Sequence, residues 1–167
     1  GARLARVDRR WREAIRAMTP SLRVSRDAEP RHVEQLLECV GAVRAVSFKC
    51  CLHLDAAILA RSAEVWGGTA LTAVDVSYCG GPGDDDVAAM IERLPKLERL
   101  RAAGTNFGRR AFGALRGVPR LVALDASFCE AVDDAGVVGW LDGGRAADLP
   151  LRSIALSWYD GDAGGDA

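Results

Sequence analysis

The architecture of this chain follows from LTAVDVSYC, residues 71–79, which recurs as LVALDASFC, residues 121–129. A third copy, VRAVSFKCC, begins at residue 43, and two weaker copies, LERLRAAGT and LRSIALSWY, begin at residues 97 and 151. All five fit the frame L-x-x-L-x-L-x-x-C, and their starts are 28, 26, 24 and 30 residues apart. A period of roughly 20–50 residues is typical of arrays in which each repeat is one supersecondary unit.

Each repeat predicts a short strand followed by a helix. The second and third apolar slots of the frame, such as Val74 and Val76, are two residues apart and therefore lie on one face of a strand. A fainter copy begins near Thr19, with Leu22 and Val24 in these two slots. Helical spacing follows the strands at Val33, Leu36, Leu37 and Val40, at Val87, Met90, Ile91 and Leu94, at Ala111, Phe112 and Leu115, and at Val137, Val138 and Leu141.

Repeats of this kind cannot bury their apolar faces alone, and stacking them closes one continuous core. We therefore expect an α/β solenoid with a parallel sheet on one face and helices on the other. The expected organisation is an N-terminal helical segment over residues 1–24, repeats over residues 25–159, and a flexible tail rich in Gly and Asp over residues 160–167.

The repeat with the clearest pattern, residues 121–141, resembles the cysteine-containing class of leucine-rich repeats. Val132, Asp133, Asp134, Gly136 and Val137 fall where that class has its I-T/S-D-x-G-L turn into the helix. The resemblance spans roughly residues 19–160 and implies a horseshoe whose concave face is the parallel sheet. The repeat from Leu97 departs from the class because it lacks the cysteine.

The last slot of the frame holds Cys51, Cys79, Thr105 and Cys129 in four successive repeats. A small, mostly apolar side chain at the end of a strand can be buried while its thiol or hydroxyl donates to a turn carbonyl. We expect a structural role for these residues, without a metal or a redox function. Five cysteines without a framework of close spacings fit reduced thiols in the cytoplasm or nucleus.

The N-terminal segment is basic and amphipathic. Val7, Arg10, Trp11 and Arg12 resemble the V-C-R-x-W-R end of an F-box, with Asp8 in place of the usual Cys. The resemblance implies that the complete F-box binds a Skp-type adaptor and that the repeats bind a target protein. The alternative is a helix that caps the first repeat, since solenoid ends need a cover with a polar outer face.

Candidate binding residues lie between the apolar slots of the strands. Among them, Asp75 and Asp125 are expected on either side of Arg101, as a cross-strand charge ladder, a polar binding groove, or both. Tyr78, Phe128 and Trp158 stand just before the last slot and predict an aromatic row at the groove edge. The candidate protein-binding residues are Lys49, Asp75, Arg99, Arg101, Asp125, Tyr78, Phe128 and Trp158.

Composition and motifs argue against other classes of function. The net charge is −1, from 22 basic and 23 acidic residues, which gives no general attraction for nucleic acid or anionic membrane. Nine Arg do fall within residues 1–31, but no nucleic-acid motif accompanies them. Asp84, Asp85 and Asp86 follow a Gly-rich turn and are expected to cap the next helix, and no cofactor site or catalytic constellation stands out.

The sequence thus predicts a protein that binds other proteins and is not an enzyme. Through the F-box resemblance, the specific expectation is a substrate-recognition subunit of an SCF-type (cullin) ubiquitin ligase, with the target on the concave face. The alternative is a structural or assembly subunit of a large mitochondrial, ciliary or ribosomal complex that uses the same repeats.

Overall fold

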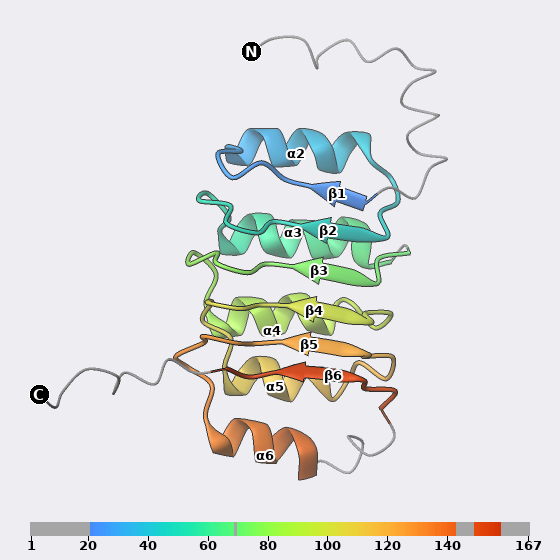
Figure 1. The fold of residues 1–167 in the computed structure, drawn as a ribbon. Coiled ribbons are helices and arrows are strands. Elements are labelled where there is room, and N and C mark those ends of the chain that lie inside the picture. Colours follow the sequence, from blue (N-terminus) through green and yellow to red (C-terminus); the bar gives the residue numbers. More distant parts are fainter. Residues whose placement is uncertain (1–20, 69, 143–148, 158–167) are drawn as a thin grey trace, which may run out of the picture.

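The computed structural model describes residues 21–68, 70–142 and 149–157. Over these residues the chain is an α/β protein with a six-stranded parallel sheet. The strands follow one another across the sheet in their order along the sequence, so each of the four inner strands pairs with the strand before it and the strand after it (Figure 1). They are β1 Ser21–Arg23, β2 Ala45–Ser47, β3 Ala73–Asp75, β4 Arg99–Arg101, β5 Ala123–Asp125 and β6 Ser153–Ala155.

The helices of the described residues alternate with the strands and lie together behind the sheet (Figure 1). Parallel neighbours need a crossover connection, and here the crossover passes through a helix on that side each time. The helices are α2 Pro30–Cys39, α3 Ala56–Gly67, α4 Asp84–Glu92, α5 Arg109–Leu115 and α6 Asp134–Asp142. The opposite face of the sheet, which we call the open face, is not covered by any of them.

The strand register follows the repeat. The residues of the second apolar slot pair side by side across the whole sheet, and the fainter first copy joins them through β1. In β2 to β5 this central residue is buried, while the residues on either side of it are more exposed. The row consists of Leu22, Val46, Val74, Leu100, Leu124 and Ile154. The predicted strands and their pairing are therefore confirmed.

The core lies between the sheet and the helices and runs from one end of the sheet to the other. Trp66 of α3 is fully buried, and its Nε1 donates to the carbonyl oxygen of Val40 at 3.0 Å. Further along, the ring of Phe112 lies 4.9 Å from that of Phe107 and 5.6 Å from that of Trp140. Such aromatic pairs add to the stability that burial of their area provides.

Two helices differ from the predicted pattern. The spacing did not single out α3, because its buried face includes Ser62 and Ala63 among larger apolar residues. The predicted apolar stripe of α6 is wrong for Val138 and Leu141, which are 51% and 44% exposed. The buried residues of α6 are instead Gly136 and Trp140, because α6 turns its glycine towards α5 and its tryptophan towards Phe112.

Some predictions fall on residues that the structure does not describe. The N-terminal helix with Val7, Arg10 and Trp11, the tail after residue 159 and the candidate Trp158 all lie outside the described residues. Residues 21–23, at the end of the predicted N-terminal segment, form strand β1. Among the described helices, none has the length and apolar character needed to cross a membrane.

Candidate functional site

The open face of the sheet carries two rows of side chains, one from the first and one from the third residue of each strand. In the third-residue row, Arg101 lies between Asp75 and Asp125, as the repeat predicts. The complete third-residue row is Arg23, Ser47, Asp75, Arg101, Asp125 and Ala155. The first-residue row is Ser21, Ala45, Ala73, Arg99, Ala123 and Ser153.

A hollow of about 350 Å³ lies on the open face between β1 and β4. Its floor is formed by the short side chains of β2 and β3, among them Ala45 and Ala73. Arg23 of β1 bounds it on one side, and Arg99 and Arg101 of β4 bound it on the other. The hollow exists because residues with long side chains flank residues with short ones.

The two arginines of β4 are exposed, while the leucine between them is buried. Neither Arg99 nor Arg101 forms an ion pair with any residue in the described part of the chain. The expected charge ladder with Asp75 and Asp125 is therefore present in the strand register but not as ion pairs. Because alternate residues of a strand lie about 6.6 Å apart, the two side chains leave the same face at about that spacing.

The flanking aspartates have a local bonding partner that the arginines lack. Asp75 Oδ1 accepts from the backbone N–H of Ser77 at 3.0 Å, and Asp125 Oδ1 accepts from that of Ser127 at 3.1 Å. Both bonds span two residues and close the turn after the strand. Ser47 Oγ accepts in the same way from the N–H of Lys49 at 3.4 Å. These three residues hold the turn, whereas a guanidinium group has no acceptor to offer.

The turn after each of the strands β2 to β5 places one residue in the left-handed region. The residues are Cys50, Tyr78, Gly104 and Phe128, with φ of 61°, 59°, 62° and 58°. A side chain at Gly104 would have its Cβ only 2.6 Å from the ring of Tyr78, so that ring lies directly over the glycine. The Nζ atom of Lys49 lies 5.8 Å from the centre of the same ring. Tyr78 and Phe128 are 49% and 43% exposed beside β4.

The residues of the last slot lie inside the turns. Cys79 Sγ donates to the carbonyl oxygen of Phe48, and Cys129 Sγ to that of Ala102, both at 3.0 Å. Thr105 Oγ1 donates to the carbonyl oxygen of Ala102 at 2.6 Å. Burial raises the pKa of the Cys79 thiol to about 11, so the thiol stays protonated and can donate. Cys51 is also buried.

Acidic residues at the start of α4 bind backbone N–H groups. Asp86 accepts from the N–H of Gly83, at the start of its own helix. Asp84 departs from the prediction, because its carboxylate accepts from the N–H groups of Gly108, Arg110 and Ala111 and thereby caps α5 in the next repeat. This happens because the residue before α5 is glycine and offers no side-chain acceptor.

Asp133 connects two helices. Its carboxylate accepts from Arg109 of α5 and from the N–H of Gly136 in α6. The hydrogen bond from Arg109 holds the pKa of Asp133 below its usual range. Within the described residues, no group of three or more His, Cys, Asp or Glu side chains is placed to hold a metal ion.

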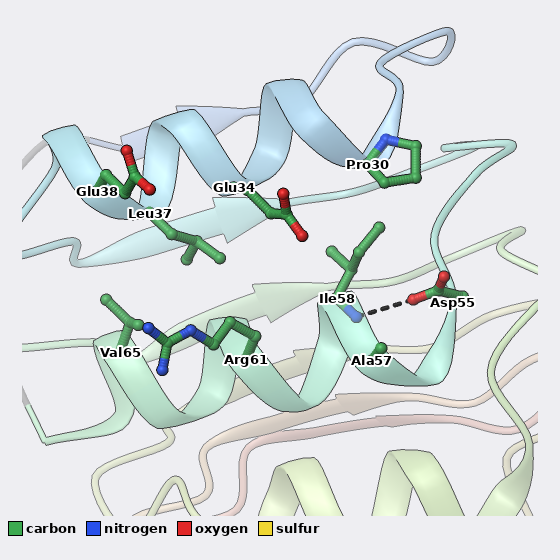
Figure 2. Close-up of a pocket in the computed structure, with 9 residues that line it drawn as sticks. All are labelled: Pro30, Glu34, Leu37, Glu38, Asp55, Ala57, Ile58, Arg61 and Val65. Carbon is green, nitrogen blue, oxygen red and sulfur yellow. Dashed lines mark hydrogen bonds between the residues drawn. The ribbon is translucent and has the colours of Figure 1, made fainter.

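A second hollow lies on the helix side, between α2 and α3 (Figure 2), and has a volume of about 460 Å³. Leu37 and Ile58 form its apolar floor. Glu34 and Glu38 of α2 line it on one side, and Arg61 of α3, which pairs with Glu64 at 2.8 Å, lines it on the other (Figure 2). Its rim is therefore mainly acidic, whereas three arginines border the hollow on the open face.

The structure brings most of the candidate residues together. Arg99, Arg101, Asp75 and Asp125 share the open face, and Lys49, Tyr78 and Phe128 lie at the edge where the strands end. Tyr78 and Phe128 do not form a continuous row, because Gly104 lies between them. Sequence reasoning missed Arg23, although Leu22 in the second slot already places it in the outward third position.

The acidic groove between α2 and α3 was also missed, since it depends on how the two helices are spaced. Comparisons with known proteins give no further guidance on these two hollows. No protein-family model matches the chain, and a search of the curated proteins finds no match.

Proposed function

We propose that the chain is a leucine-rich-repeat solenoid that binds a partner protein on the open face of its sheet. In support of the fold, strands of one sheet follow in sequence order, and the helices lie on one side. In support of the repeat type, cysteine and threonine at the strand ends bond to turn carbonyls in successive repeats. The open face is then the concave face of a horseshoe.

The observation that carries the binding function is the exposed arginine pair of β4, which forms no ion pair, beside a hollow whose lining on β2 and β3 includes alanine, serine and Asp75. Neither arginine contributes an ion pair to the described part of the fold. A rigid sheet supports them, and such a surface can be positioned accurately against a partner. The proposed activity is binding through surface contact and charge, and the proposal includes no catalytic step.

The more specific proposal is a substrate-recognition subunit of an SCF-type ubiquitin ligase. It is supported by the similarity of Val7, Arg10, Trp11 and Arg12 to the end of an F-box, directly ahead of the repeats. In this arrangement the complete F-box binds the Skp-type adaptor, and the open face binds the protein to be modified. Ubiquitin transfer belongs to other subunits.

The experiment is purification of the full native protein, tagged, with mass spectrometry of the proteins that elute with it. Adaptor and cullin in amounts near those of the protein support the ligase role. A stoichiometric set of assembly subunits without adaptor or cullin would instead show the alternative, a structural subunit of a large complex.

Two substitutions test target binding on the open face and adaptor binding through the N-terminal segment separately. Ala73→Trp fills the hollow on the open face and should remove the target while leaving the adaptor. Ala60→Trp is the matched control, because Ala60 is exposed on α3, outside the hollow. Trp11→Ala should have the opposite effect and remove the adaptor alone. If the Ala73→Trp variant still retained the target as well as the adaptor, the target would bind on another surface of the protein.

A further inference from the structure

The repeat of β4 differs from its neighbours at its surface positions while keeping their core. Its second apolar slot, Leu100, is buried and pairs with Val74 and Leu124 as the repeat requires. On the open face, β2, β3 and β5 all begin with alanine, but β4 begins with Arg99. Because alanine occupies this position in three other strands of the same sheet, the fold does not require a long charged side chain there.

The third position of β4 shows the same departure more sharply. In β2, β3 and β5 this residue is Ser47, Asp75 or Asp125, and each accepts a bond from the backbone two residues later. Arg101 cannot make that bond, since its guanidinium group only donates. The β4 repeat therefore gives up a local turn contact and gains an exposed cation in its place.

The two cations are matched in spacing to an extended acidic segment. Successive side chains of an extended chain alternate in direction, so residues i and i+2 point the same way about 6.6 Å apart. This is also the spacing of Arg99 and Arg101 along β4. Arginine binds carboxylates through two parallel N–H···O bonds, which gives both strength and orientation.

We propose that the β4 arginines bind a partner segment with acidic residues at alternate positions, Glu-x-Glu or Asp-x-Asp, in extended conformation. The proposal rests on the open face being the binding surface. The residue between the two acids points away from the sheet, so it is unrestricted. Arg23, across the alanine floor of the hollow, provides a third positive charge for acidic residues further along the segment.

The surrounding charges favour a short acidic segment over a polyanion. Asp75 and Asp125 lie on the strands at either side of β4. A carboxylate bound to Arg101 lies between these two aspartates, and like charges at such positions are destabilising, so every further negative charge of a polyanion adds to this cost. The groove between α2 and α3 is excluded as the acidic-segment site, because Glu34 and Glu38 line it.

The test is an NMR titration of the full chain with three synthetic peptides in a Gly-rich background. The first contains Glu-Ala-Glu, the second Gln-Ala-Gln, and the third Glu-Glu-Ala, in which adjacent carboxylates point in opposite directions. We expect the first peptide to shift amide signals of β3, β4 and β5 and to bind at least about tenfold more tightly than the other two. This affinity should fall as salt rises, because salt screens exposed charges.

Charge exchange makes the test specific. The double variant Arg99→Glu/Arg101→Glu should lose Glu-Ala-Glu and gain binding of a Lys-Ala-Lys peptide. The matched control, Arg61→Glu/Arg93→Glu, changes the same charge on the helix side and should leave the peptide affinity unchanged. Thermal melts confirm that each variant is folded.

The outcomes separate this proposal from the one on which it rests. Failure of the folded wild-type chain to prefer Glu-Ala-Glu, or equal binding by the charge-exchanged variant, would overturn the acidic specificity. If Ala73→Trp still removed the native target in that case, the open face would remain the binding surface and only its preference would be wrong. If Ala73→Trp also had no effect, both proposals would fail.

Discussion

The β4 repeat and its neighbours β3 and β5 share a backbone and a core but differ in what they present to solvent. All three strands place a buried aliphatic residue at the centre, and their residues pair directly in one register. The neighbours then carry an aspartate that closes the turn and an aromatic residue in the left-handed position. The β4 repeat carries Arg101 and Gly104 at those positions. The difference shows which side chains the fold needs and which it leaves available for binding.

The largest effect is expected in the shared core, where the repeats should behave alike. Leu100→Ala and Leu124→Ala each remove a buried side chain from the same row, and each should lower the free energy of unfolding by about 2–5 kcal/mol. Urea denaturation of both variants measures this. A cost for Leu100→Ala well below that for Leu124→Ala would mean that β4 is loosely attached, contrary to its register.

The repeat register explains why so much of the fold was predictable. Five copies of one frame fix which residues pair, because a slip by one residue would turn every buried side chain to the other face. Departures arise where contacts come from another repeat. Asp84 caps α5, 24 residues further along at Gly108, and no spacing within its own helix indicates this. Likewise, the buried face of α6 depends on close packing of Gly136 against Phe112.

The geometry of the candidate binding surface was less predictable than the fold. The frame places Arg99 and Arg101 outward, but it does not show that the hollow extends to Arg23, because the first copy of the repeat is degenerate. Nor does it show that Asp75 and Asp125 turn to their own backbones and do not pair with Arg101. These outcomes depend on side-chain geometry, which a pattern of apolar positions does not specify.

The next effect concerns Gly104, the position at which β4 lacks an aromatic residue. Gly104→Ala places a Cβ against the ring of Tyr78 and forces a non-glycine residue to φ near 62°. We expect a loss of about 1–3 kcal/mol in the free energy of unfolding. In a Tyr78→Ala background, Gly104→Ala should lower the free energy of unfolding by a smaller amount, because the clash with the ring is gone and only the strain of a non-glycine residue at positive φ remains. Equal costs in the two backgrounds would show that the ring does not restrict this position.

A third effect is a contribution of the β3 repeat to the pH dependence of stability. The β4 repeat does not make this contribution, because Cys79 titrates and Thr105 does not. The pKa of Cys79 is raised by burial from 9.0 to about 11. The folded state therefore holds the proton more tightly than the unfolded state, and this contribution is present below pH 9 and is lost as pH rises towards 11. Denaturation between pH 8 and 11 should show a steeper fall for the wild type than for Cys79→Ala, by on the order of 1–2 kcal/mol. Parallel curves would contradict burial of the thiol.

The smallest expected effects bear most directly on function. Asp125→Ala removes the acceptor for the Ser127 N–H and should cost about 0.5–1.5 kcal/mol, whereas Arg101→Ala removes an exposed side chain without an ion pair and should change stability by less than about 0.5 kcal/mol. Urea denaturation at neutral pH measures both, with Asp75→Ala as a second member of the aspartate class. A cost for Arg101→Ala equal to that for Asp125→Ala would give Arg101 a structural role, and the β4 arginines would then no longer point to a ligand. A negligible cost would show that the fold does not need the Arg101 side chain, as the proposed binding role requires.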